Sequence, residues 1–260
     1  MRVIIHENEK KIGTWLGDYI AARINEFNPT ANKPFVLGLA TGSSPITTYA
    51  RLIEIHKEGR LSFEHIITFN MDEYVDLPQD HPESYYSFMW KHLFNHVNIK
   101  KENVHIPNGN AKDLAAECLA YEAAIQKAGG VHFFLGGIGV DGHLAFNEPG
   151  TSLSSRTHIQ KLNYETRLVN SRFFNNDINQ VPKEAMSVGV ATVMDSKEVA
   201  LIVTGHNKAR ALHKVVEGGI SQMWTASALQ MHPSAMIVCD ENACSELKVG
   251  TYRYFKEMES

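Results

Sequence analysis

Short apolar runs rich in Val, Ile and Phe alternate along the chain with longer stretches in which apolar residues recur three and four positions apart. The apolar runs are VII at 3, FVLGLA at 35, HIITFN at 65, VHFFLGGI at 131, SVGVATVM at 187, VALIVTG at 199 and AMIVCD at 235. Near-continuous apolar runs of this length predict strands of a sheet that is buried on both faces.

Helical periodicity marks intervening stretches such as ITTYARLIEIHKEG, AAECLAYEAAIQKAGG and KARALHKVVEGG, and each of them ends in the glycine that often follows a helix. The alternation of strands and helices predicts a doubly wound α/β fold, with a mostly parallel sheet and helices on both faces. No repeat or linker interrupts this pattern, so we expect residues 1–260 to form a single domain. The polar, aromatic segment 151–185 lacks a clear period and is expected to be an inserted segment or mobile lid.

The composition narrows the possible partners. The formal net charge is −4, and Lys and Arg are dispersed, so the basic patch of a nucleic-acid binder is missing. No stretch reaches the roughly 18 apolar residues of a membrane span, and the apolar run at the start is very short. We therefore expect a cytoplasmic protein that binds neither nucleic acid nor membrane and whose partners are small or proteinaceous.

Cysteine and histidine usage gives no sign of a metal or redox centre. The three cysteines, Cys118, Cys239 and Cys244, lack the paired C-x-x-C spacing and are expected to be reduced and buried. The 13 histidines are scattered without a ligand cluster.

In doubly wound sheets, ligands bind beyond the carboxyl ends of the strands. The first strand end of interest is LGLATGSSP, where Thr41, Gly42 and Ser43 precede a helix that Pro45 opens. Exposed amides and hydroxyls at such a helix start can hold a phosphate, and the alternative is an ordinary capping serine. The segment lacks the G-K-[ST] of a nucleoside-triphosphate loop.

The second strand end, HIITFNMDEYVDLP, carries Asp72 and Glu73 just beyond the strand. Successive strand residues point to opposite sides, so one carboxylate can face a crevice while local hydrogen bonds hold the other. A carboxylate in the crevice would be a candidate general base. The alternative is a pair of acids in a solvated turn.

The third strand end, GGIGVDGHLAFNEPG, has the spacing G-x-G-x-x-G. In a dinucleotide-binding loop the last glycine begins a helix, but here Pro149 soon interrupts any helix that starts at Gly142. A clear strand-ending acid about 20 residues further on is also missing, so a dinucleotide is disfavoured.

The same turn holds Asp141, His143 and Glu148 within eight residues. Two carboxylates beside a histidine can orient the imidazole and raise its pKa, which suits proton transfer near neutral pH. These side chains could also bind a metal, but without a second histidine we favour acid/base chemistry.

Lys208 falls at the start of the helix that follows VALIVTG. The helix dipole disfavours a cation there by a few tenths to about 1 kcal/mol, and a bound phosphate would compensate. The alternative is that Lys208 points into solvent.

The chain resembles the glucosamine-6-phosphate deaminase family over nearly its whole length, through LGLATGSSP, ITFNMDEYVDLPQDHPESYYSFM, GGIGVDGHLAFNEP, SSRT, NSRFF, QVPKEAMSVGVATVMD, MWTASALQMHP and ELKVGTYRYF. The pair MDEY and DGHLAFNEP is far more specific than either glycine run. The resemblance implies conversion of glucosamine 6-phosphate and water to fructose 6-phosphate and ammonium, without a metal or other cofactor.

The resemblance also implies roles for particular residues. The substrate-binding residues it implies are Thr41, Gly42, Ser43, Arg172 and Lys208, with Arg172 contributed by the lid. The catalytic residues it implies are Asp72, Asp141, His143 and Glu148. His143, supported by the other two members of its turn, would open the sugar ring. Asp72 would then move the C2 proton to C1.

Assembly and regulation are likewise expected by resemblance. The long C-terminal segment through TYRYFKEMES is similar to that of hexameric members, so we expect a homo-hexamer. Members activated by N-acetylglucosamine 6-phosphate hold its phosphate at a subunit interface, and the corresponding positions here are Ser152, His158, Gln160 and Tyr254, with Lys161 as a neighbouring cation that could partly substitute. Histidine and glutamine stand where those members have arginine and lysine, so we expect weak or absent activation at about pH 8.

Three other functions stand beside this one. A 6-phosphogluconolactonase also carries a D-G-H turn, but a different sequence is expected after it. A non-catalytic sugar-phosphate sensor is opposed by the intact acid/base residues. A metal-dependent hydrolase would lose activity in the presence of a chelator.

Overall fold

A seven-stranded parallel sheet forms the centre of the computed structural model, which describes residues 1–259. Its strands are β1 (Arg2–His6), β2 (Phe35–Leu39), β3 (Ile66–Asn70), β5 (Val104–His105), β6 (Phe133–Gly137), β9 (Glu198–Val203) and β10 (Ala235–Asp240). They neighbour one another in the order β1-β10-β9-β6-β2-β3-β5. From β2 the chain moves outward through β3 to β5, then returns to β6 on the other side of β2. The order thus reverses between β2 and β6, which confirms the doubly wound fold and marks the point where such sheets bind ligands.

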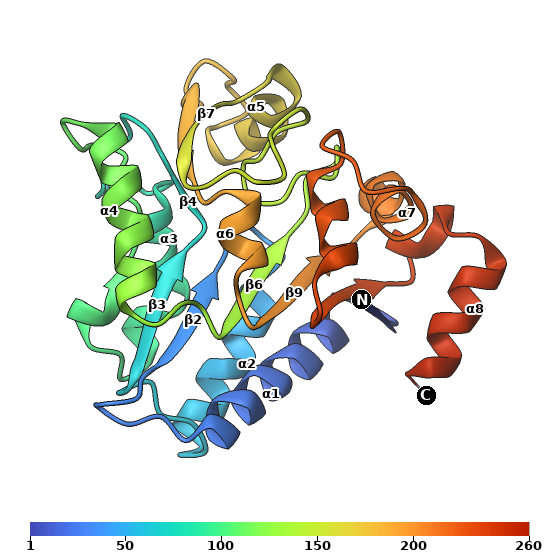
Figure 1. Ribbon diagram of the computed structural model, residues 1–260, viewed down its shortest axis with the longest axis horizontal. Coiled ribbons are helices and arrows are strands. Elements are labelled where there is room, and N and C mark those ends of the chain that lie inside the picture. Colours follow the sequence, from blue (N-terminus) through green and yellow to red (C-terminus); the bar gives the residue numbers. More distant parts are fainter. Residues whose placement is uncertain (260) are drawn as a thin grey trace.

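Helices cover both faces of this sheet (Figure 1). One face packs against α1 (Glu9–Phe27), α2 (Ile46–Lys57) and α3 (Tyr85–His92), and the other against α4 (Leu114–Lys127), α6 (Val190–Met194) and α7 (Ala209–Glu217). Successive strand residues such as Val36 and Leu37 belong to the two different cores, because strand side chains alternate between the faces. The helices predicted from periodicity correspond to α2, α4 and α7.

The remaining helical elements lie between or outside these layers. The last helix, α8 (Val249–Met258), contacts β1 at the edge of the sheet. Short 3-10 helices are η1 (Phe94–His96), η2 (Lys101–Asn103), η3 (Ser171–Phe173), η4 (His206–Lys208), η5 (Thr225–Met231) and η6 (Ala243–Glu246). Among residues 1–259, no helix is both long and apolar enough to cross a membrane. The three cysteines are buried and free of disulfides, as predicted.

A second, antiparallel sheet has the order β4-β8-β7 and is formed by β4 (Asp72–Tyr74), β8 (Glu184–Ser187) and β7 (His158–Lys161). With α5 (Tyr164–Asn170) it forms the upper part of the molecule in Figure 1. Its small core consists of Tyr74, Leu77, Phe146, Leu162, Phe174, Val181 and Ala185. The segment 151–185 therefore has regular structure of its own, and its movement as a lid stays a prediction.

The predicted strand SVGVATVM is wrong in its second half. The strand β8 ends at Ser187, and the helix α6 begins at Val190 after an extended Gly189. Val190 and Val193 are fully buried, and Val193 belongs to the same core as α4 and α7. A largely buried helical turn leaves the same apolar run as a buried strand, so periodicity cannot separate the two.

Gly189 offers a test of this junction. An added Cβ would lie 2.1 Å from the carbonyl oxygen of Ser155, so Gly189→Ala must displace backbone. We expect a loss of about 1–3 kcal/mol in the free energy of unfolding, measured by chemical denaturation. Gly219→Ala is the control, because an added Cβ there meets nothing within 4 Å. Equal stability of the two variants would contradict the close approach.

Candidate active site

A cavity of about 290 Å³ opens at the carboxyl ends of the central strands, between the two sheets. Seven of the residues expected at the site line it, namely Thr41, Gly42, Ser43, Asp72, His143, Arg172 and Lys208. They come from the loops after β2 and β6, from β4 and from η3 and η4, so segments far apart in the chain meet at the reversal of strand order.

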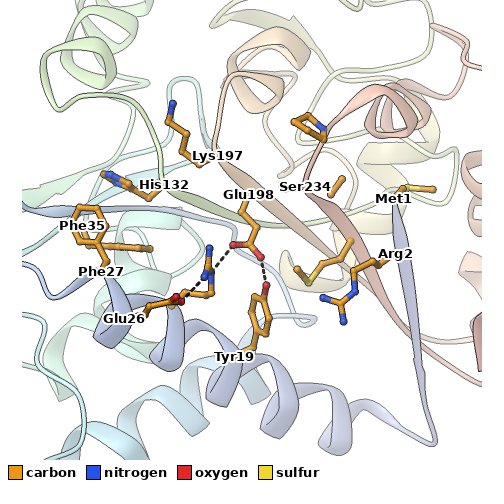
Figure 2. A pocket seen from close by; sticks show the side chains of 14 residues that line it. Met1, Arg2, Tyr19, Glu26, Phe27, Phe35, His132, Lys197, Glu198 and Ser234 are labelled. Atoms are coloured by element: carbon orange, nitrogen blue, oxygen red, sulfur yellow. Dashed lines mark hydrogen bonds and ion pairs between the residues drawn. The ribbon is translucent and has the colours of Figure 1, made fainter. Parts of the chain in front are cut away.

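A larger hollow of about 550 Å³ lies at the opposite, amino-terminal ends of the strands (Figure 2). Its central carboxylate, Glu198, accepts hydrogen bonds from the Tyr19 hydroxyl and from Nε of Arg23, the latter at 2.9 Å. Arg23 forms ion pairs with both Glu26 and Glu198 there, and none of the residues expected at the site lines this hollow.

Asp72 and Glu73 divide as the alternation of strand side chains predicts. Both are buried on β4, but only Asp72 lines the cavity. The Glu73 carboxylate instead accepts backbone hydrogen bonds from Tyr74, Tyr85 and Tyr86 at 2.9, 3.0 and 2.9 Å. The solvated-turn alternative therefore does not describe this pair.

The Asp72 carboxylate is poorly solvated and has no hydrogen-bond or ion-pair partner among residues 1–259. Burial, with a further contribution from the charge of Glu73, raises the pKa of Asp72 to about 8. A carboxylate of this kind is a much stronger base than a solvated aspartate, because taking up a proton removes a poorly solvated charge.

The glycine run after β6 forms a tight turn in which isolated bridges pair Ile138 with Leu144 and Leu144 with Asn147. Gly142 adopts φ +75°, which only glycine takes without strain, and its backbone packs against Trp224. Residues 138–150 contain no helix, so the geometry of a dinucleotide loop is missing from this part of the described chain.

This turn places His143 in the cavity and Asp141 beside it. Nδ1 of His143 lies 2.8 Å from Oδ1 of Asp141, whose carboxylate also accepts the His143 amide at 3.3 Å. Burial alone would raise the pKa of Asp141, but the hydrogen bond and charge of His143 lower it below its ordinary value. Asp141 is thus an ionised partner that fixes one ring nitrogen and leaves Nε2 for a ligand.

Glu148 lies close to this pair but has another partner. Its carboxylate accepts the amide of Asn163 at 3.3 Å and a short hydrogen bond from the Asn163 side chain. Asn163 also caps α5, so Glu148 ties the turn to the segment 151–185 and is not hydrogen-bonded to His143 in the described residues.

One group of side chains within residues 1–259 has ligand atoms close enough to hold a metal ion, namely Asp141, His143 and Glu148, whose ligand atoms all lie within 4.8 Å of one another. All three side chains already have protein partners. Asp141 and His143 pair with each other, and Glu148 accepts hydrogen bonds from Asn163. These partners favour proton transfer over metal binding.

Lys208 lies at the start of α7 and is half-buried at the floor of the cavity. Its Nζ donates to the carbonyl of Ile138 at 2.7 Å. Burial lowers the pKa of Lys208 to about 8. The negative charge of Asp141 opposes this shift, and the positive charge of Arg172 adds to it. A dianion bound beside Lys208 would stabilise the charged form, so this lysine is arranged for an anionic ligand and does not point freely into solvent.

The segment 151–185 contributes Arg172, which is exposed and stacks over the ring of Phe173 with its guanidinium carbon 4.6 Å from the ring centroid. The side chain of Asn170 donates to the Tyr74 hydroxyl at 3.0 Å. That bond joins the end of α5 to β4, the strand that carries Asp72.

The residues expected to bind an activator do not converge within one chain. Ser152, His158, Gln160 and Lys161 lie on or before β7, where His158 Nε2 is 3.2 Å from Oε1 of Gln160. Tyr254 lies on α8, well apart from β7 in Figure 1, with 57% of its surface exposed. These two groups therefore do not meet in one chain, and the activator site stays a prediction.

The cavity also contains residues that the sequence did not single out, including Tyr74, Tyr85, Thr204 and Asn207. Thr204 and Asn207 could have been found, because they follow β9 at its carboxyl end. The two tyrosines could not, because β4 and the start of α3 come together only through long-range packing.

A doubly wound fold with acid/base groups and a lysine gathered at its reversal point is typical of α/β enzymes that act on phosphorylated substrates. The chain belongs to the family described as glucosamine-6-phosphate isomerases/6-phosphogluconolactonase, whose model matches residues 7–244.

Curated relatives in this family resemble the whole chain. A glucosamine-6-phosphate deaminase of Parabacteroides distasonis is 62% identical over 259 residues, which cover 100% of this chain and 96% of the relative. The enzyme of the same name from Bacteroides thetaiotaomicron is 60% identical over 260 residues, with 100% and 96% covered.

Solved structures agree with the fold. A monomeric glucosamine-6-phosphate deaminase superposes with a TM-score of 0.90 at 41% identity, covering 94% of this chain and 99% of that chain. A 6-phosphogluconolactonase from Trypanosoma cruzi has a TM-score of 0.74 at 19% identity, covering 95% and 97%, and this likeness concerns the fold alone.

Removing Lys208 tests whether the cavity holds a phosphate. Lys208→Ala should weaken binding of glucosamine 6-phosphate by about 1.5–3 kcal/mol and leave glucosamine nearly unaffected, because a charge-assisted contact is lost. Arg210→Ala is the matched control, since this exposed residue pairs with Glu246 outside the cavity. Equal losses for both sugars, measured by calorimetry, would show that Lys208 does not bind phosphate.

Proposed function

We propose that the protein converts glucosamine 6-phosphate and water to fructose 6-phosphate and ammonium by acid/base catalysis. The observation that carries this proposal is Asp72, a buried carboxylate that faces the cavity with its pKa raised to about 8 and with no ion-pair partner within residues 1–259. The curated relatives at 60–62% identity support the choice of substrate, because both are named glucosamine-6-phosphate deaminase.

Substrate binding begins with the phosphate. Lys208 provides the charge at the floor of the cavity, and Thr41, Gly42 and Ser43 provide hydroxyl and amide donors from the loop before α2. Arg172 closes over the sugar from the segment 151–185. An anion held at one end fixes the sugar carbons relative to the acid/base groups.

Ring opening is the task of His143. The imidazole takes the proton of the anomeric hydroxyl and delivers a proton to the ring oxygen, so the C1–O5 bond breaks, the open-chain aldehyde forms and the imidazole returns to its starting state. Asp141, at 2.8 Å from Nδ1, holds the ring and stabilises its charged form. Glu148 lies close to this pair, and its hydrogen bonds from Asn163 connect the turn to the segment 151–185.

Isomerisation is the task of Asp72. The carboxylate takes the proton from C2 of the open-chain amino sugar, and an enolamine forms as the C1 oxygen gains a proton and the ammonium nitrogen loses one. Asp72 then returns the C2 proton to C1. Carbon 2 is then an iminium carbon, to which water adds. The C2–N bond breaks, ammonium leaves, and fructose 6-phosphate remains, so an isomerisation is coupled to a hydrolytic deamination.

Incubation with glucosamine 6-phosphate tests this function, with ammonium and fructose 6-phosphate assayed in parallel. We expect equal amounts of the two products, and undiminished rates in a chelator. Hydrolysis of 6-phosphogluconolactone in place of this reaction would contradict the proposal. Binding of the sugar phosphate without turnover would assign the chain a sensor role, and loss of activity in the chelator would indicate a metal-dependent hydrolase.

Assembly and location belong to the same proposal. A homo-hexamer is supported only by the resemblance of the C-terminal segment, and one similar solved structure is described as monomeric. Sedimentation velocity distinguishes the two assemblies directly. The proposed cytoplasmic location rests on the sequence, in which no stretch is long and apolar enough to be a membrane span.

Asp72→Asn tests the base. An amide cannot accept the C2 proton, so we expect turnover to fall by at least about 10²–10⁴-fold, while folding and ligand binding persist. The direct readout is exchange of the C2 proton with deuterium in heavy water, followed by NMR. Exchange at the wild-type rate in this variant would show that another group is the base.

A further inference from the structure

Glu73, the neighbour of Asp72, is a buried carboxylate to which the reaction proposed above assigns no task. It is 4% exposed, and three backbone N–H groups, one from β4 and two from α3, donate to it. Burial raises the pKa of Glu73, and those hydrogen bonds oppose the shift. The carboxylate is thus held in one position from two elements.

The two donors from α3 are the amides of Tyr85 and Tyr86, the first two residues of the helix. The amides of the first turn have no partners within a helix, and a carboxylate placed there also interacts favourably with the helix dipole. The side chain of Ser84 accepts from the amide of Ser87, so the start of α3 is held by two separate caps. Glu73 is the cap that comes from another element.

This cap fixes one wall of the cavity. Tyr85 lines the cavity, and its ring packs 4.8 Å from the Tyr74 ring and 6.3 Å from the Phe146 ring, measured between centroids. The backbone of Tyr85 is bonded to Glu73, so the side chain of one strand residue sets the position of this wall.

The same cap directs Asp72. Neighbouring residues of β4 point to opposite sides, and Asp72 and Glu73 pair in register with Ser187 and Met186 of β8. A Glu73 carboxylate fastened to α3 therefore turns the Asp72 carboxylate toward the cavity. Asp72 itself has no partner among residues 1–259 that could hold it there.

We propose that Glu73 is a positioning residue of the reaction, whose carboxylate fastens the start of α3 to β4 and thereby fixes both the Tyr85 wall and the direction of the Asp72 base. The proposal rests on the function assigned above. It adds a second task, because the negative charge of Glu73 next to Asp72 disfavours a second negative charge and so strengthens Asp72 as a base.

Other titratable groups surround Asp72. The phenols of Tyr49, Tyr74, Tyr85 and Tyr121, on α2, β4, α3 and α4, interact with its charge. Burial raises the pKa of each phenol above its ordinary value, so all four stay neutral while Asp72 titrates. His143, Arg172 and Lys208 line the same cavity, but they are not among the causes of the raised Asp72 pKa, which are burial and Glu73. After burial, the charge of Glu73 contributes to the raised pKa of Asp72.

Two substitutions separate the tasks. Glu73→Gln removes the charge. The NH2 group of the glutamine cannot accept a hydrogen bond, so at least one of the three backbone N–H groups loses its partner. We expect kcat to fall at least about tenfold with KM within about twofold, because a displaced base costs rate more than binding. The acid limb of kcat/KM should move to lower pH by about one unit, because Asp72 loses a like charge and its pKa falls.

Glu73→Asp keeps the charge but withdraws the carboxylate by one methylene. The kcat value should fall about as far as in Glu73→Gln, and the acid limb should stay near its wild-type position. The substrate's own ionisations are common to all these profiles, so they cancel when each variant is compared with the wild type.

Asp76→Asn is the control for charge alone. Asp76 is exposed, lies near the end of β4, and adopts φ +60°, a conformation that asparagine accepts. We expect wild-type kcat and an unmoved acid limb in this variant. A shift equal to that of Glu73→Gln would mean that any nearby charge suffices, and would overturn the assignment.

The outcomes separate this proposal from the function on which it rests. A wild type that makes no ammonium or fructose 6-phosphate contradicts the function. An active wild type with unchanged kcat in both Glu73 variants overturns the positioning role. A fall in kcat in step with lost thermal stability, with the acid limb of Glu73→Gln unmoved, overturns it as well, because it indicates a merely structural cap. If Glu73→Gln does not fold, unchanged kcat in Glu73→Asp alone overturns the role.

Discussion

A carboxylate that is buried without an ion-pair partner is the constraint on which this structure depends. Water or a cation would stabilise the charge of Asp72 and make it a weak base, whereas complete burial would keep substrate away. The fold meets both needs by placing the residue on a short strand at the wall of a cavity, beside a second carboxylate whose own charge is satisfied by backbone amides.

The two sheets contribute different parts of this cavity. The parallel sheet has both faces buried and brings the loops after β2, β6 and β9 to one place, so the phosphate-binding candidates and the His143 turn meet there. The antiparallel sheet holds β4 against β8 and joins it to the segment 151–185. Hydrogen bonds from Asn170 and Asn163 connect that segment to Tyr74 and Glu148, one on each side of the site.

Local sequence was sufficient for those parts of the fold and the site that depend on local rules. Apolar runs predicted six of the seven central strands and missed β5, which has only two residues. Strand alternation predicted that Asp72 and Glu73 would face different surroundings. Periodicity misassigned α6, because a largely buried helical turn resembles a strand. Three other features depend on contacts between segments that are separated in the sequence. They are the antiparallel sheet, the hydrogen bonds from Asn163 to Glu148 and the position of Tyr85 at the cavity. A local pattern does not specify which other segment a residue will contact.

The most direct test of this account is a titration of the Asp72 carboxyl group in the ligand-free protein, followed by carbon NMR with aspartate labelled at the side-chain carboxyl carbon. Asp72→Asn, by removing one resonance, assigns the signal. The account predicts a midpoint near the pKa of about 8 that burial and Glu73 give this group. A midpoint at the ordinary aspartate value of about 4 would contradict it, because Asp72 would then be a solvated carboxylate and a weak base.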